Sequence, residues 1–123
     1  MRVVTGGNRG SAYGGRFTGQ VELEMLDEAP ATDRPDTALG HFAAGATTNW
    51  HSHPGGQLLW VVSGRARVGT DVDGEVVLAP GTLVVAGAGE RHWHGAAAAS
   101  DTIVLSLTWG TTSWEDLASG ATP

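Results

Sequence analysis

Short apolar runs, broken at close intervals by turn-forming residues, dominate this chain. Apolar and acidic residues alternate over residues 20–26, which is typical of a half-buried strand. Further apolar runs follow at 38–42, 50–53, 58–62, 66–69, 76–78, 83–86 and 103–109. The breaks between them include Ser63-Gly64, Asp73-Gly74, Pro80-Gly81 and Gly87-Ala88-Gly89, which favour tight turns. Many short strands at this spacing predict an all-β sandwich or barrel.

The two ends of the chain depart from this pattern. Residues 1–19 are predicted to be a loop or a loosely attached arm, because residues 5–16 are rich in glycine and polar side chains. Residues 20–112 then form one barrel domain, and residues 113–123 a short helix or tail. The only candidate helix covers 112–119, with Ser113 as its N-cap ahead of acidic residues in the first turn.

Composition restricts the possible functions. The 123 residues are 41% hydrophobic and 16% charged, as in one globular domain. The net charge of −6 leaves no basic stripe for phosphates or anionic lipids, so we expect no nucleic-acid or membrane partner. The chain has no cysteine and no lysine, which excludes thiolate nucleophiles and Schiff bases. No apolar run approaches the roughly 18 residues of a membrane span, and we expect a cytoplasmic protein.

Four of the five histidines fall in two tight pairs, His51-Ser52-His53 and His92-Trp93-His94. On an extended strand alternate residues share a face, so each pair can direct both imidazoles into the same space. Imidazole is the commonest ligand of transition metals, whereas Ca²⁺ or Mg²⁺ would require carboxylates. Gln57 begins the apolar run that follows the first pair, and its amide oxygen can complete the set. The sequence therefore predicts one divalent transition metal: Mn, Fe, Ni, Co or Zn.

The remaining ring-bearing residues favour structural roles. His41 stands alone beside Phe42, and a lone histidine on a strand is more often a structural residue than a ligand. The tryptophans are expected mainly in the core or at an interface, with some in a pocket wall. They are Trp50, Trp60, Trp93, Trp109 and Trp114.

The histidine pairs lie in two motifs that resemble those of cupins, over residues 38–109. The first family motif, Gly-x5-His-x-His-x3–4-Glu-x6-Gly, matches with every spacing kept at Gly45, His51, His53, Gln57 and Gly64. The second, Gly-x5-Pro-x-Gly-x2-His-x3-Asn, matches at Gly81, Gly87, Gly89, His92 and Ala96. Gln57 replaces the usual Glu, Gly87 the Pro, and Ala96 the Asn. The resemblance implies an antiparallel jelly-roll barrel, the cupin double-stranded β-helix.

Within that family the chain is most similar to small cupins that resemble metal-dependent hydroxynitrile lyases, which share the Gln ligand and the His-Trp-His-Gly-Ala sequence. By this resemblance the metal ligands are His51, His53, Gln57 and His92, and His94 is the acid–base residue. The lyases carry a second histidine and a glutamine on the following strand, where this chain has Val104 and Thr108. Substrate handling is therefore expected to differ.

The expected activity is lyase or isomerase chemistry on a small carbonyl, cyanohydrin or enol, with the metal as Lewis acid and no organic cofactor. A dioxygenase with a redox-active metal is the first alternative, and a non-catalytic protein that binds a metal or small ligand is the second. We also expect a homodimer, with the strand at residues 21–26 as a candidate for exchange between copies.

Overall fold

A computed structural model describes residues 1–11, 16–29 and 34–115. In these ranges the chain forms strands joined by turns and contains no helix. The strands are β1 (Arg9–Ser11), β2 (Phe17–Thr18), β3 (Val21–Asp27), β4 (Asp36–Phe42), β5 (Thr47–Thr48), β6 (His51–Ser52), β7 (Gln57–Ser63), β8 (Ala66–Thr70), β9 (Gly74–Leu78), β10 (Leu83–Ala86), β11 (His92–Ala96), β12 (Thr102–Thr108) and β13 (Ser113–Trp114).

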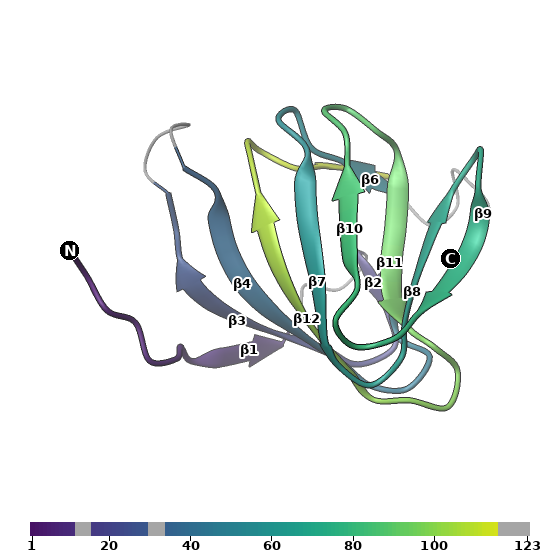
Figure 1. The fold of residues 1–123 in the computed structure, drawn as a ribbon, viewed down its shortest axis with the longest axis horizontal. Helices are drawn as coiled ribbons and strands as arrows, with labels where there is room; N and C mark the ends of the chain where they lie inside the picture. Colours follow the sequence, from purple (N-terminus) through teal and green to yellow (C-terminus); the bar gives the residue numbers. More distant parts are fainter. Residues whose placement is uncertain (12–15, 30–33, 116–123) are drawn as a thin grey trace.

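The strands form two sheets that curl into a half-open barrel (Figure 1). The first sheet has the order β1-β3-β4-β12-β7-β10, and the second has the order β13-β6-β11-β5-β2. Strand β8 also pairs with β11, and β9 pairs with β8. Every pairing is antiparallel, for example β12 with β4 and with β7. The predicted all-β jelly roll is confirmed.

Alternation along the strands separates an inner from an outer face of the first sheet. On β7 the side chains of Gln57, Leu59 and Val61 are buried, whereas Trp60 and Val62 are 42% and 45% exposed. This is the period of two expected of a pleated strand with one face on a core. On the inner face Leu59, Val61 and Val104 form a buried cluster with Ala66 of the second sheet, and a second cluster joins Val21, Phe42, Ala46 and Ala96.

Both chain ends differ from the sequence-based expectation. Part of the predicted N-terminal loop is a strand, since β1 pairs with β3 along Arg9–Ser11. The predicted helix start is wrong: Ser113 lies in β13, which pairs with β6 instead of capping a helix. In both cases backbone hydrogen bonds to a neighbouring strand decide the conformation. Such bonds do not depend on side-chain type, so the sequence shows no alternating pattern at these short strands. Residues 116–123, the rest of that predicted helix, lie outside the described residues, and the boundaries at residues 20 and 112 stay predictions.

A glycine fixes the turn that closes the first motif. Gly64 has φ +82°, which side-chain-bearing residues rarely adopt, and a Cβ there would lie 2.1 Å from the carbonyl oxygen of Asp101. The turn between β7 and β8 therefore requires glycine at this position.

Among the described residues, no helix has the length and apolar character that a membrane crossing requires.

Candidate metal centre

The two histidine pairs meet where β6 runs beside β11. His51 lies opposite His92 in the register, and their ring centroids are 4.4 Å apart. The His53 ring lies 4.8 Å from His51 and 5.3 Å from His92. One ligand nitrogen from each of these three buried residues lies within 4.8 Å of the other two. The three histidines are therefore positioned to bind one metal ion.

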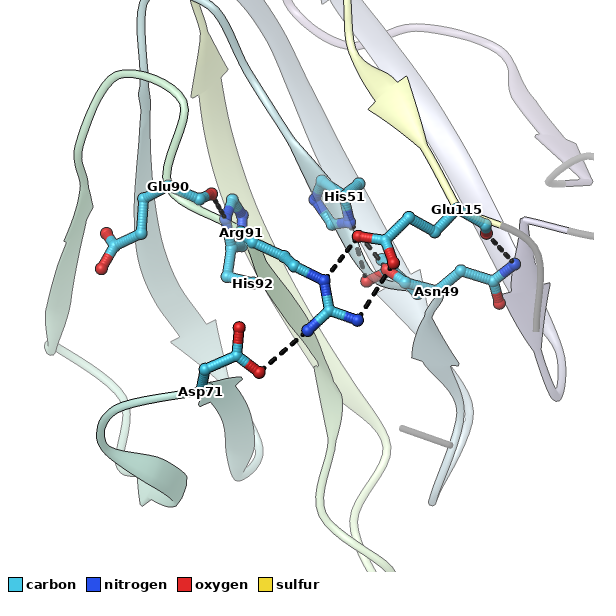
Figure 2. A network of polar contacts seen from close by, with 8 residues as sticks. Asn49, His51, Asp71, Glu90, Arg91, His92 and Glu115 are labelled. Carbon is cyan, nitrogen blue, oxygen red and sulfur yellow. Dashed lines mark hydrogen bonds and ion pairs between the residues drawn. The ribbon is translucent and has the colours of Figure 1, made fainter. Parts of the chain in front are cut away.

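Backbone carbonyls orient two of the three rings. His51 donates from Nδ1 to the carbonyl oxygen of Asn49 at 2.8 Å, and His92 donates from Nδ1 to that of Glu90 at 2.9 Å (Figure 2). A carbonyl oxygen only accepts hydrogen bonds, so both neutral rings carry their proton on Nδ1 and a lone pair on Nε2. This outer hydrogen bond is the usual arrangement of metal-binding histidine.

His53 follows the same arrangement through a side chain. Its Nδ1 lies 3.0 Å from Oγ1 of Thr112, whose hydroxyl can accept the proton. Its Nε2 is buried and has no hydrogen-bond partner among the described residues. A buried nitrogen left without a partner is costly unless something binds it, and a metal ion would remove this cost.

Gln57 presents its oxygen to the same point. Its Nε2 donates to Oγ1 of Thr108 at 2.8 Å, and its Oε1 lies 3.0 Å from Nε2 of His92. With the His92 proton on Nδ1, both facing atoms carry lone pairs, and two acceptors at this distance repel unless a cation lies between them. The donor set therefore fits a transition metal, with three imidazoles and one amide oxygen.

Burial keeps these histidines neutral. Desolvation, reinforced by the neighbouring His92, lowers the pKa of His51 to about 3 and that of His53 to about 4. Burial also lowers the pKa of His92. Imidazole binds metals in its neutral form, so protons do not compete strongly for the ligands near pH 7.

His94 lies two residues after His92 on β11, on the same face of the strand, and lines the cavity beside the three-histidine cluster. Its ring centroid is 5.3 Å from that of His51 and 6.0 Å from that of His92, and its ring packs edge-on against Phe42 at 5.7 Å. Burial is the main cause that lowers its pKa well below the ordinary value. His94 is thus a neutral imidazole that can accept a proton in the cavity.

The cavity has a volume of about 550 Å³. Its floor holds His51, His53, Gln57 and His94. The rest of the lining includes apolar and aromatic side chains, hydroxyl groups, and arginine and aspartate side chains. The non-floor residues are Arg16, Phe17, Leu23, Met25, Ala29, Arg34, Asp36, Ala38, Gly40, Phe42, Thr48, Val104, Ser106, Thr108, Gly110, Thr111, Thr112 and Trp114. This space suits a small organic molecule with both apolar and oxygenated parts.

The other candidate residues fall on different faces. His41 points away from the cavity, and its Nε2 lies 3.0 Å from a carboxylate oxygen of Glu24. Among the tryptophans, Trp114 lines the cavity and its ring centroid lies 4.7 Å from that of His51. Val104 and Thr108 both line the cavity. The two positions at which the resemblance implied a histidine and a glutamine in the lyases therefore face the cavity.

Some residues that support the site escaped the sequence analysis. The His51 and His92 rings are each held by the carbonyl of the residue two positions earlier, which any amino acid could supply, so no signal marks Asn49 or Glu90. Thr112 was assigned to the start of a helix, and its contact with His53 depends on the fold.

Comparison with known families agrees with the motifs. The sequence model of the Cupin domain family matches residues 38–109, more than half of the chain. The chain belongs to the cupin family. Both histidine pairs and Gln57 fall within the matched segment.

Known proteins similar to this cupin differ in their activities. Over 99 residues the chain is 36% identical to an (R)-mandelonitrile lyase of Granulicella tundricola, covering 79% of this chain and 76% of that protein. A cupin-like protein of Thermotoga maritima superposes with a TM-score of 0.79 at 30% identity, covering 94% of this chain and 90% of that one. An acetylacetone dioxygenase of Acinetobacter johnsonii shares the fold, with a TM-score of 0.76 at 17% identity over 94% of this chain and 77% of that one.

Proposed function

We propose that this cupin is a metal-dependent lyase or isomerase for a small carbonyl, cyanohydrin or enol. One divalent transition metal, with Mn, Fe, Ni, Co and Zn all suited to the donor set, is held by His51, His53, Gln57 and His92. The observation that carries the proposal is the convergence of four neutral donor atoms in a buried floor, with His94 beside them in the same cavity. The likeness to a mandelonitrile lyase supports the cyanohydrin class.

When bound, the ion would keep its full double charge, because all four ligands are neutral, and would stabilise oxyanion or cyanide charge as it develops. The chain supplies the remaining functions. Phe42 and Trp114 lie against the histidine rings, where they limit the space open to an apolar group.

His94 moves the proton. Because its imidazole is neutral, it accepts the hydroxyl proton of a cyanohydrin. As that proton leaves, the carbonyl forms, the bond to the nitrile carbon breaks, and the electron pair leaves with cyanide. His94 then returns the proton to cyanide. The reverse sequence adds hydrogen cyanide to an aldehyde, so His94 acts as base in one direction and as acid in the other.

The test replaces His94 by alanine and measures cleavage of mandelonitrile. We expect turnover to fall to background while elemental analysis finds the metal content of the wild type, because His94 is not a ligand. His41→Ala is the matched control, since that histidine lies on the outer face against Glu24. A His94→Ala protein with normal turnover would remove this residue from the mechanism.

The same three-histidine cluster would also suit a redox-active metal, which leaves the dioxygenase as the second candidate. Oxygen consumption with a 1,3-diketone such as acetylacetone discriminates between the two, since the lyase consumes no oxygen. Failure of both assays on fully metallated protein would favour the non-catalytic binding protein.

We also propose a homodimer, formed through the outer face of the first sheet. Leu83, Trp60, Leu105 and Leu39 lie in register across β10, β7, β12 and β4. Leu83 and Trp60 are 51% and 42% exposed, and an apolar row of this kind is typical of an interface. The predicted exchange segment, β3, pairs on both edges within its own chain, with β1 and β4. We therefore place the interface on this face instead of at β3.

A further inference from the structure

The strand that carries His51 has little backbone pairing of its own. Strand β6 is two residues long, meets β11 at the single register position His92↔His51, and meets β13 at two positions. Strands are usually about 3–10 residues long, so a strand of two residues contributes few hydrogen bonds that could hold the distance to its neighbours. The separation of the two ligands therefore depends on contacts outside the ladder.

An ion-pair cluster spans β6 from one neighbouring strand to the other. Arg91, the residue before β11, donates from Nε and Nη2 to the two carboxylate oxygens of Glu115, just after β13, at 2.6 and 3.0 Å (Figure 2). Its Nη1 donates to Asp71 at 2.9 Å, and its guanidinium lies 3.8 Å from the ring centroid of Trp50. This two-pronged geometry is more directional than a single surface contact.

Glu115 is joined to both ligand-bearing segments. Its carbonyl oxygen accepts a hydrogen bond from Nδ2 of Asn49 at 3.0 Å, and the carbonyl of Asn49 in turn holds Nδ1 of His51. Its backbone N–H donates to the carbonyl oxygen of Trp50 at 3.0 Å. On the other side, its carboxylate accepts two hydrogen bonds from Arg91, which directly precedes His92.

We propose that Glu115 is a positioning residue for the metal centre: its backbone is tied to Asn49 and Trp50 beside His51, and its carboxylate ties this segment to Arg91 and so sets the distance between His51 and His92. The inference rests on the metal site proposed above. Loss of the carboxylate should let β13 and the residues before β6 move relative to β11. The ligand nitrogens would then be held less firmly at their common point, and the ion would bind more weakly and in an altered geometry.

The test measures Co²⁺ binding to metal-free full-length protein, by chelator competition and by the visible absorption of the bound ion. For Glu115→Ala we expect a dissociation constant raised about three- to tenfold, which is below the 10- to 100-fold typical of residues that contact a ligand directly. We also expect a changed Co²⁺ absorption band. Glu115→Gln keeps the shape and loses the charge, and should lie between Glu115→Ala and the wild type.

Glu75→Ala is the matched control. Glu75 accepts from Nη1 of Arg67 at 2.9 Å, and that guanidinium lies 5.4 Å from the Trp93 ring centroid, so the variant removes a similar ion pair over a tryptophan in the second sheet. It should lower the melting temperature slightly and leave the Co²⁺ affinity within twofold of the wild type and the absorption band unchanged.

The outcomes separate the two proposals. A wild type that fails to bind one equivalent of Co²⁺ overturns the metal site itself. If the wild type binds but Glu115→Ala matches it in both affinity and absorption band, Glu115 is only a surface ion-pair residue and the positioning role is wrong. Should Glu115→Ala fail to fold, the Glu115→Gln values decide by the same criteria.

Discussion

Acid should destabilise the metal-free protein strongly, because its histidine cluster is buried in the neutral form. Burial lowers the pKa of His51 to about 3 and that of His53 to about 4 in the folded state, against 6.5 for an exposed histidine. Below pH 6.5 the unfolded chain therefore binds protons that the folded chain cannot. The free energy of unfolding must fall as the pH falls from 6.5 toward 3 to 4.

The two values give the size of the effect. Between pH 7 and pH 5, each of these two histidines costs the folded state about 2 kcal/mol, or about 4 kcal/mol together. Burial shifts the pKa values of His92 and His94 in the same direction, which adds to the loss. Since the unfolding free energy of a small domain is roughly 5–15 kcal/mol, this is a large fraction of the whole.

Urea unfolding of chelator-treated protein at pH 7, 6 and 5, followed by tryptophan fluorescence, measures this dependence. His53→Gln removes one titrating group. Between pH 7 and pH 5 the free energy of unfolding of this variant should therefore fall by about 2 kcal/mol less than that of the wild type. An unfolding free energy equal at pH 7 and pH 5 in the wild type would mean that the histidines are not buried as neutral rings.

Three further variants test separate parts of the account. Thr108→Val removes the acceptor that orients the Gln57 amide, so chelator competition should show metal binding weakened about tenfold. Gly95→Ala would place a Cβ 2.2 Å from the carbonyl oxygen of Ala46, so strands β5 and β11 must separate. Thermal denaturation should show that the free energy of unfolding falls by about 2 kcal/mol or more. Trp60→Lys puts a charge into the exposed apolar row, and light scattering should report a monomer.

Each of these variants has an outcome that would count against the account. Unchanged metal affinity in Thr108→Val would mean that the amide of Gln57 does not depend on this hydroxyl. A wild-type melting temperature in Gly95→Ala would contradict the close approach of the two strands. A Trp60→Lys protein that keeps the mass of a dimer would put the interface on another face.

The strands and the ligand cluster follow from short-range sequence patterns. A strand over residues 20–26 was predicted from alternation, and the structure has it at Val21–Asp27. The two-residue spacing predicted that the histidine pairs meet, and His51 lies opposite His92. These features depend on the period of an extended chain, which the sequence displays directly. Gln57 was expected from its place at the start of the next strand; the structure puts its Oε1 3.0 Å from Nε2 of His92, and its role as fourth ligand stays a prediction.

The supporting residues could not be predicted in the same way. Strand β13 has two residues, so it has no periodicity, and Ser113 followed by acidic residues also fits a helix start. The sequence therefore did not indicate which tryptophan lines the cavity, namely Trp114, or that Glu115 reaches Arg91. Contacts of this kind join segments more than twenty residues apart, and only the closed sheet brings them together.

Four side chains, those of His51, His53, Gln57 and His92, are proposed to hold one metal ion in the cavity floor. A crystal structure of metal-loaded protein, with anomalous scattering collected at the absorption edge of the metal, tests this most directly. We expect one anomalous peak, about 2.0–2.3 Å from Nε2 of His51, His53 and His92 and from Oε1 of Gln57. An anomalous peak at another place, or no peak between these atoms in protein that carries one equivalent of metal, would show that these four side chains do not form the metal site.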